Sequence, residues 1–383
     1  MDWEPHARRL AADTIHPSSR WYEPVATTPR HLFVPRWWER AEGGRIVRDG
    51  AADADRWLRT AYSDETLVTR MGTVHADHAE PGAFVPSGTW PTSSSTLPTL
   101  VVTMYRHAMI TDDSTVLVTC GSGYGTALAC HRLGAEQVTS VDIDGYLVAA
   151  ATDRLAAAGL HPHTAVCDIT KQLPGTYDRI VSTVSVRPVP PSWLEALRPG
   201  GRLVTTISGT GLILVADKKG DGTATGCIAA TGASFMSARH GEDHDDAVLA
   251  PAEVWETAQY AEGESVTTGR YPLTYVPDTW DLRSTLELLA PGIDHRQTED
   301  EEGRRTIYML HADGSWARAT AAGRRDSPTV HQGGPRRLWD ELDRIRTWLV
   351  IDGYLPVSGA RVRVDPDGAI HLNRSGWSAT IPA

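Results

Sequence analysis

Paired cysteines and long apolar runs are both missing from this sequence of 383 residues. The four cysteines, Cys120, Cys130, Cys167 and Cys227, form no CxxC pair, so we expect neither disulfides nor a thiolate zinc site. No apolar stretch reaches the length of about 18 residues that a membrane-spanning helix needs. The first residues also lack the basic and apolar regions of a signal peptide, so we expect a cytoplasmic protein.

Positive charge is in deficit as well. The sequence has 48 Asp and Glu against 37 Lys and Arg, which gives a formal net charge of −11. Such a balance argues against broad binding to a phosphate backbone, so nucleic acid is not an expected partner. The chain is long enough to bury a full core and is typical of two domains.

The most informative segment of the chain covers residues 115–129. An apolar, β-branched run passes into the closely spaced Gly121, Gly123 and Gly125, and an Ala/Leu-rich helical pattern follows. Glycines at such a turn let the backbone approach a ligand closely. A second buried run ends in Asp142, 19 residues after Gly123, where a strand-end carboxylate accepts the hydroxyls of a ribose. This pattern predicts a site for a nucleoside cofactor.

Helical and strand patterns alternate from residue 97 to residue 207. The expected helices are 97–110, 123–133, 145–158 and 190–197, and the expected strands are 115–120, 138–142, 163–167, 178–184 and 202–207. The alternation predicts an α/β fold with a Rossmann-like, doubly wound parallel sheet whose ligands lie at the carboxyl ends of the strands. Residues 211–216 and 223–239 are expected to add an antiparallel hairpin to this sheet.

The flanking regions divide the chain into three parts. We expect an N-terminal helical segment over residues 1–75, a cofactor-binding core over 76–240 that begins with a Gly/Pro/Ser/Thr-rich loop to residue 96, and a C-terminal α+β extension over 241–383. Within the extension, a helix is expected at about 336–350 and a hairpin at 360–364 and 369–372.

Three features favour S-adenosyl-L-methionine, with S-adenosyl-L-homocysteine as the product, over a nicotinamide cofactor. The third glycine is misplaced for the G-x-G-x-x-G pattern of dehydrogenases, while Asp142 is placed for a ribose and Asp168 for an adenine amino group. The run LRPGGRLV at 197–204 matches a turn and strand that recur in methyltransferases of this sheet type. The simpler alternative is a structural turn followed by carboxylates that are solvated or cap helices.

Several further motifs carry a resemblance to one family. These are PRHLFVP at 29–35, AYSD at 61–64, SGY at 122–124, YDRIVST at 177–183 and PPSW at 190–193 followed by PGG at 199–201. With them the sequence resembles the protein-L-isoaspartate O-methyltransferases, a family of carboxylate methyltransferases that use S-adenosylmethionine.

The resemblance implies a set of site residues. The segment TSSSTLP at 92–98 replaces the family's active-site segment and places Thr96 at the position of the catalytic serine, directly after Ser94 and Ser95. Their hydroxyls would orient a substrate carboxylate, which needs no strong base to attack a sulfonium methyl group. The alternative is a Ser/Thr cap for the helix that begins near Leu97, and we expect both roles together. The implied cofactor-binding residues are Thr119, Cys120, Gly121, Ser122, Gly123, Tyr124, Asp142, Ile143, Asp168 and Thr183.

The cofactor loop departs from the family pattern just before the glycines. Thr119 stands where the family has its first glycine, and the family's acidic residue has no counterpart. A protein that binds cofactor and peptide without transferring a methyl group is therefore an alternative. Cys120 is interpreted as a small packing residue rather than a reactive thiol, and Ser182 with Thr183 either lines the site or ends a strand.

The long tail and the Ser-Ser-Ser-Thr segment resemble a branch of the family that acts in the biosynthesis of ribosomally made, modified peptides such as lanthipeptides, graspetides and lasso peptides. This resemblance implies a monomer that methylates an aspartate of a modified precursor peptide. The ester then closes to an aspartimide, which persists or hydrolyses to isoaspartate. Repair of L-isoaspartate in damaged proteins is the alternative. We expect the tail to select the peptide, so that deletion beyond about residue 245 spares cofactor binding and abolishes turnover.

A metal site is not expected. His240, Asp243, His244, Asp245 and Asp246 offer metal-ligating groups within one short stretch, but a solvated acidic loop explains this composition better.

Overall fold

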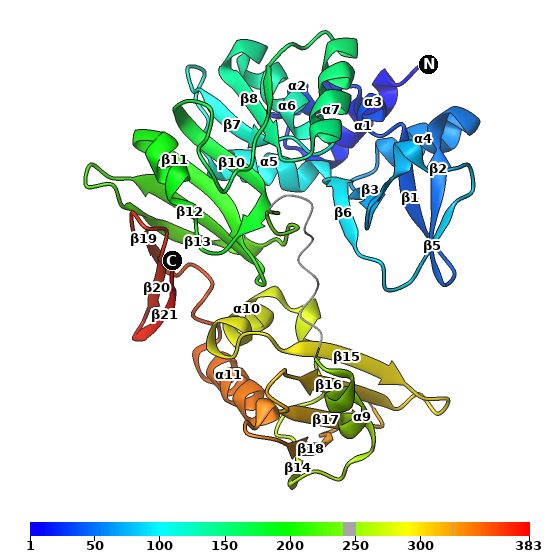
Figure 1. Ribbon diagram of the computed structural model, residues 1–383, viewed down its shortest axis with the longest axis vertical. Coiled ribbons are helices and arrows are strands. Elements are labelled where there is room, and N and C mark those ends of the chain that lie inside the picture. The colour runs from blue at the N-terminus through cyan, green and yellow to red at the C-terminus, as the bar shows by residue number, and fades with distance from the viewer. Residues whose placement is uncertain (240–249, 324) are drawn as a thin grey trace.

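The computed structural model describes residues 1–239, 250–323 and 325–383. Three β-sheets, of six, ten and five strands, form the centres of three lobes (Figure 1). The ten-stranded sheet lies between the N-terminal lobe and the lobe at the bottom of that view. Within the described part of the chain, no helix is long and apolar enough to cross a membrane.

The central sheet contains the predicted parallel core. Its strands lie in the order β21-β20-β19-β13-β12-β11-β10-β7-β8-β9, and those from β11 to β9 are parallel. The parallel strands are β7 (Val116–Thr119), β8 (Val138–Asp142), β9 (His163–Val166), β10 (Tyr177–Val186) and β11 (Leu197–Ile207). Strand β7 is followed by β8 on one side, while β10 lies on its other side. This reversal of strand order is where open α/β sheets bind ligands.

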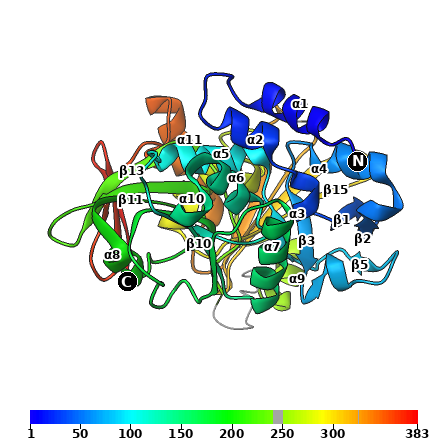
Figure 2. The same cartoon turned by 90° about the horizontal axis from the view of Figure 1, so that it is seen from above.

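Helices cover both faces of this sheet, which confirms the doubly wound prediction (Figure 2). Successive residues of β7 show why, because side chains alternate across a strand. Val116 and Val118 pack in a cluster with the N-terminal helices, and Leu117 packs in the opposite cluster with Trp193. The helices of the core are α5 (Pro98–His107), α6 (Tyr124–Leu133), α7 (Gly145–Ala157) and α8 (Pro191–Ala196).

Antiparallel strands extend the sheet beyond β11. The predicted hairpin is confirmed as β12 (Leu212–Lys218) and β13 (Ala224–Gly232). Three strands from the end of the sequence then pair onto β13: β19 (Arg361–Val364), β20 (Ile370–Arg374) and β21 (Trp377–Ile381). The predicted hairpin near the C-terminus is therefore present, but it belongs to the central sheet and not to a separate extension.

The remaining part of the predicted extension forms the third lobe. Its antiparallel sheet consists of β14 (Ser265–Thr268), β15 (Asp294–Glu299), β16 (Arg305–Leu310), β17 (Trp316–Ala321) and β18 (Thr329–Gly333). Its helices are α9 (Ala252–Tyr260), α10 (Trp280–Leu289) and α11 (Leu338–Asp352), the last of which confirms the helix expected at 336–350. Helix α10 packs on the central sheet, where Ser284 accepts a hydrogen bond from Gly211 at 2.9 Å and Arg187 pairs with Glu287 at 2.8 Å.

The N-terminal region differs from the prediction. Residues 1–75 do contain α1 (Glu4–Thr14), α2 (Tyr22–Thr27), α3 (Arg30–Phe33) and α4 (Ala54–Ala61). They also contain strands, so the mostly helical interpretation is wrong, and residues 76–96 are not one loop. The strands are β1 (Arg36–Ala41), β2 (Gly44–Asp49), β3 (Leu67–Met71), β4 (Val74–His75), β5 (Phe84–Pro86) and β6 (Pro91–Ser95).

Two consecutive tryptophans explain the strand at β1. Trp37 packs in the cluster with the N-terminal helices, whereas Trp38 packs in the separate core of the N-terminal sheet. Burial of two adjacent large side chains on opposite sides requires the two-residue period of a strand, because adjacent residues on a helix point to neighbouring directions. The turn into β2 passes through Gly43 at φ +72°, a left-handed conformation that favours glycine.

Ion pairs join the N-terminal sheet to the core. Arg70 on β3 donates to the carboxylate of Asp144 at 2.7 Å, and Asp144 caps the start of α7. Asp77 accepts hydrogen bonds from Tyr146, at 2.7 Å, and from Arg154. The N-terminal sheet is thereby fixed beside the carboxyl ends of β7 and β8.

Candidate active site

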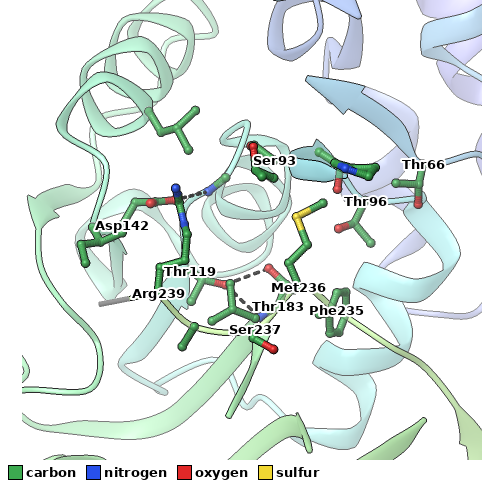
Figure 3. Close-up of a pocket in the computed structure, with 18 of the residues that line it drawn as sticks. Thr66, Ser93, Thr96, Thr119, Asp142, Thr183, Phe235, Met236, Ser237 and Arg239 are labelled. Atoms are coloured by element: carbon green, nitrogen blue, oxygen red, sulfur yellow. Dashed lines mark hydrogen bonds between the residues drawn. The ribbon is translucent and has the colours of Figure 1, made fainter. Parts of the chain in front are cut away.

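A cavity of about 670 Å³ lies at the carboxyl ends of the parallel strands (Figure 3). This size is within the range of about 300–1,000 Å³ that is typical of small-molecule sites. Its walls come from β6 and the residues that flank β3, from the ends of β7, β8 and β10, and from the segment after β13. Predicted site residues in the wall are Ser94, Thr96, Thr119, Gly121, Asp142, Ile143 and Thr183. The cavity therefore joins the predicted cofactor end to the predicted substrate end.

The glycine turn has two different reasons for its glycines. Gly123, at φ +89°, is held by packing, because a Cβ there would lie 3.0 Å from the Cβ of Ala151 and 3.2 Å from Phe33. Gly121, at φ +52°, faces the cavity, and an added Cβ would meet only the carbonyl oxygen of Ser94, at 3.5 Å. The open backbone at Gly121 is thus the part of the turn that a ligand can approach.

Asp142 is the acidic group at the cofactor end. Its carboxylate accepts hydrogen bonds from the backbone N–H groups of Gly121 and Asp144, each at 3.1 Å. Burial raises the pKa of this carboxyl, although those two hydrogen bonds and the charge of Arg239 act in the opposite direction. A carboxylate has about four lone-pair positions, so two remain for further donors. A carboxylate in a cavity that keeps two free acceptor positions suits the two hydroxyls of a ribose. Asp142 therefore fits the ribose of S-adenosylmethionine.

Asp168, which the sequence predicts to contact an adenine, makes local contacts in the structure. The carboxylate of Asp168 accepts from the backbone N–H and the hydroxyl of Thr170, at 3.0 and 2.6 Å, and it lies 3.4 Å from the ammonium of Lys171. It is not part of the cavity wall, whereas its neighbours Cys167 and Ile169 are. In this structure, the surface available to an adenine is therefore apolar.

Thr119, the residue that replaces the family's first glycine, makes contact across the sheet. Its hydroxyl oxygen lies 2.8 Å from that of Thr183 on β10 and accepts a hydrogen bond from the Thr183 backbone N–H at 2.8 Å. Both side chains line the cavity (Figure 3). The replacement therefore contributes a bridge between β7 and β10 at the floor of the site.

Four predicted cofactor-binding residues support the turn from behind rather than facing the cavity. Cys120, Ser122, Gly123 and Tyr124 are absent from the wall that the described residues form. Burial raises the pKa of the Cys120 thiol to about 12, so the group remains a neutral thiol at physiological pH. The packing interpretation of Cys120 is therefore the better one.

The predicted catalytic segment is a strand, β6, and not a helix cap. Ser94 and Thr96 line the cavity, whereas Ser95 points away and is buried, with a hydroxyl that has no hydrogen-bond partner in the described part of the chain. Pro91, Thr92 and Ser93 line the cavity as well, so Ser95 is the one residue of 91–96 that is absent from the wall. Of the three predicted hydroxyls, two can reach a substrate.

The start of helix α5 is capped by other residues. Asp64, from the AYSD motif, accepts hydrogen bonds from the backbone N–H and the hydroxyl of Thr99, at 3.0 and 2.7 Å. The hydroxyl of Thr66 accepts from the backbone N–H of Leu97 at 3.2 Å. The prediction that Thr96 caps this helix is therefore wrong. The backbone N–H groups of Leu97 and Thr99 are already bonded, so they are not free to bind an anion.

Sequence reasoning missed part of the wall. The missed residues include Thr66, Trp90, Ser93 and residues 234–239. The last segment is held by Ser185, whose backbone N–H donates to the Met236 carbonyl and whose carbonyl accepts from the Ala238 N–H, both at 2.8 Å. This contact joins residues about 50 positions apart and leaves no local pattern. The residues from His240 to Asp246 that were considered for metal binding lie outside the described part of the chain.

Sheet order, glycine turn and acidic strand end together define a domain of the S-adenosylmethionine-dependent methyltransferase class. Within this class, residues 84–237 match the family model described as protein-L-isoaspartate(D-aspartate) O-methyltransferase. The comparison supports the predicted family for this segment. The N-terminal helices, strands β1 to β4 and the third lobe lie outside the match.

The chain is also similar to individual methyltransferases. The chain is 38% identical over 114 residues to protein-L-isoaspartate O-methyltransferase of Azorhizobium caulinodans, which covers 29% of this chain and 52% of the relative. It is 29% identical over 158 residues to ribosomal protein L11 methyltransferase of Geotalea uraniireducens, and this alignment covers 39% of this chain and 48% of the relative. The chain thus spans about half the length of these curated relatives. A solved protein-L-isoaspartate O-methyltransferase aligns with 99% of this chain and 98% of its own, at 16% identity and a TM-score of 0.49.

Proposed function

We propose that the protein is an S-adenosylmethionine-dependent O-methyltransferase that esterifies an aspartate side chain of a ribosomally made, modified peptide. One observation carries the proposal: a single cavity is lined both by Gly121 and Asp142 and by Ser94 and Thr96. A carboxylate held at the second pair would be within the same enclosed volume as a cofactor held at the first.

The cofactor would be held at three places. Asp142 would accept the ribose hydroxyls, the open backbone at Gly121 would face the cofactor, and Ile143 with Cys167 would contact the adenine. S-adenosylmethionine supplies an electrophilic methyl group, which a carboxylate oxygen accepts as the neutral thioether leaves. Since an ionised carboxylate is already nucleophilic, the site needs no general base.

The chain's own contribution is orientation. Ser94 and Thr96 place two neutral hydroxyl donors on one wall, and neutral donors hold a carboxylate without removing its nucleophilic charge. Fixing the reacting oxygen in line with the methyl group converts an encounter into a near-intramolecular step. The ester would then close to an aspartimide by attack of the next backbone nitrogen, with loss of methanol. The aspartimide would either persist or be opened by water to isoaspartate.

The choice of a modified peptide rests on what lies outside the family match. The third lobe, residues 250–355, adds a sheet and three helices that a match over 84–237 does not account for. No described residue beyond Arg239 lines the cavity. In this proposal the lobe binds parts of the peptide that are remote from the reacting aspartate.

Methylation of L-isoaspartate in damaged proteins is the second candidate, and the family match favours it. The two can be separated by offering labelled S-adenosylmethionine with a cyclised aspartyl peptide, its linear form and an isoaspartyl peptide. We expect turnover of the cyclised peptide. Turnover of the isoaspartyl peptide alone would replace the first proposal by the second. Calorimetric binding of cofactor without transfer to any peptide would indicate a non-catalytic binding protein.

A further inference from the structure

The substrate end of the cavity has apolar walls. Leu97 and Leu100 line it from the start of α5, and Phe235 and Met236 line it from the segment after β13. Figure 3 shows Met236 between Thr96 and Thr183, with Phe235 beside it. All four side chains are half-buried, so each keeps some apolar surface for a ligand. Ser94 and Thr96 thus lie in a surround that contains these apolar side chains together with the polar Thr66 and Ser93.

Trp90 completes this surround and is the most exposed of its members. Its side chain is 57% exposed although it lines the cavity, while its carbonyl accepts a hydrogen bond from the Gly72 backbone N–H at 2.9 Å. The backbone is therefore fixed, and the indole remains largely in water. An indole held in this way at a cavity is a strong anchor for a partner, because tryptophan is enriched among the residues that dominate binding energy.

Charge is confined to the opposite end. Among the described residues that line the cavity, Asp142 and Arg239 are the only charged ones, and Arg239 acts electrostatically on Asp142. Figure 3 shows both on the side away from Thr66 and Thr96. A second charged side chain, brought in beside the reacting carboxylate, would find no charged partner in this part of the described wall, and burying it there would be costly. The substrate end is therefore expected to disfavour a charged neighbour of the aspartate.

We infer that the methylated aspartate has a bulky apolar neighbour in its peptide, and that Trp90, Phe235 and Met236 select this neighbour. The inference rests on the proposed function, because it takes Ser94 and Thr96 as the place of the reacting carboxylate. Consecutive Cα atoms lie about 3.8 Å apart, so the residue next to that aspartate must meet the surrounding wall. Selection at this position is a property of the N-terminal sheet and the 234–239 segment, and not of the third lobe.

The test uses four peptides that differ only beside the aspartate, where they carry Ala, Glu, Leu or Trp. The neighbour is varied before the aspartate and, in a second set, after it. Methyl transfer from labelled S-adenosylmethionine is measured, because ester formation is insensitive to how fast the aspartimide closes. We expect Leu and Trp peptides to exceed the Ala peptide by about tenfold in kcat/KM in at least one set, and the Glu peptide to be the poorest.

Two variants assign the selection to its residue. Trp90→Ala should reduce the preference for Leu and Trp to about twofold or less, with an unchanged dissociation constant for S-adenosylhomocysteine. Phe84→Ala is the matched control, since Phe84 is a 50% exposed aromatic residue of the same sheet that does not line the cavity. It should retain the full preference. Equal preference in Trp90→Ala and wild type would overturn the assignment.

The inference and the proposed function can fail separately. Wild-type protein that methylates all four peptides equally would overturn the inference and leave the function intact. Transfer to none of them would overturn the function, and the inference is then decided by binding. For this, asparagine replaces the aspartate, and calorimetry measures the dissociation constants with protein saturated in S-adenosylhomocysteine. Tighter binding of the Leu and Trp analogues supports the selection, and equal constants refute it.

Discussion

The guanidinium group of Arg30 donates a hydrogen bond to the carbonyl oxygen of Thr96 at 3.3 Å. Arg30 is completely buried and also donates to three carbonyl oxygens in the 61–65 segment, at 2.6 to 3.0 Å. Its central carbon lies 5.1 Å from the centre of the Tyr124 ring, at the first residue of α6. One buried cation therefore connects the proposed substrate segment with the helix that follows the glycine turn.

Replacing Arg30 should affect the rate more than cofactor binding. In Arg30→Lys a single ammonium cannot reach four carbonyl groups, and each unsatisfied buried group costs about 1–3 kcal/mol. We expect a lower melting temperature, a kcat reduced by about tenfold or more, and a cofactor dissociation constant within about twofold of wild type. Calorimetry and initial-rate kinetics measure the two effects.

Arg318 provides a matched control for this substitution. It donates to the backbone carbonyls of Ala258, Gln259 and Ala261, at 2.6 to 3.0 Å, in the third lobe. Arg318→Lys should lower the melting temperature to a similar degree and leave kcat unchanged. A similar loss of kcat in both variants would mean that Arg30 acts only through general stability.

The hydroxyls of Ser94, Ser95 and Thr96, at the end of β6 and just after it, should differ in their effect on the reaction. Thr96→Ala and Ser94→Ala each remove a donor from the cavity wall, so we expect kcat to fall by about tenfold, the value of roughly 1.4 kcal/mol for a hydrogen bond. Ser95→Ala is the control within the same strand, because that hydroxyl is buried away from the cavity. Steady-state kinetics with the peptide substrate measure kcat for the three variants. An equal loss of kcat in all three would indicate that the substitutions disturb the strand.

Asp142→Asn should weaken cofactor binding. Hydrogen bonds to an ionised group contribute about 1.5–3 kcal/mol, so we expect the dissociation constant of S-adenosylhomocysteine to rise by roughly ten- to a hundredfold. Calorimetry at pH 7 measures the change. Asn is chosen because it has nearly the same shape as Asp without the charge. A dissociation constant within about twofold of the wild-type value would exclude Asp142 from the ribose site.

The same carboxyl predicts a trend of stability with pH. Burial raises its folded-state pKa above the unfolded value of about 3.8, so the folded protein binds this proton more tightly than the unfolded chain. Burial of the ionised carboxylate lowers the free energy of unfolding. This loss is complete at neutral pH and disappears as the pH falls through the folded-state pKa. The stability of wild type relative to Asp142→Asn should therefore rise from pH 7 toward pH 4. Urea unfolding of both proteins across this range measures it, and a fall would contradict the desolvated state of Asp142.

Deletion beyond about residue 245 should not leave a functional cofactor site, contrary to the expectation from the sequence. It would remove β19, which pairs with β13 over four residues, and the part of the core that α10 contributes. We expect the shortened protein to aggregate or to unfold at a much lower temperature. Soluble protein with wild-type cofactor affinity would show that these strands are dispensable.

The parallel core could be predicted from the sequence because its signals are local. Apolar runs, glycines at turns and helical spacing gave β8 its observed bounds and α6 to within one residue. The N-terminal strands were missed because two adjacent tryptophans do not show the alternation of apolar and polar residues that marks a strand. Their opposite orientation is seen only from the two separate cores in which they pack. The turn Gly43-Gly44 was the local signal that could have indicated a hairpin.

The site was predicted where one strand end determines it and missed where distant segments meet. Gly121, Asp142 and Thr183 follow from strand ends alone. The carboxylate of Asp168 lies outside the cavity wall and bonds to Thr170 in a local turn that the Asp-x-Thr spacing permits. The 234–239 segment and Trp90 reach the cavity through pairing with Ser185 and Gly72, and no short sequence pattern encodes either contact.

The pairing of β13 with β19 has a consequence for how this chain is made. Cys227 and its partner Arg361 are 134 residues apart, so β13 is synthesised long before the strand that covers its edge. During translation at about 5–20 residues per second, the edge would stay open for several seconds, and such edges invite pairing with other chains. Slowed translation or scarce chaperones should therefore lower the yield of this protein before they affect any of its chemistry.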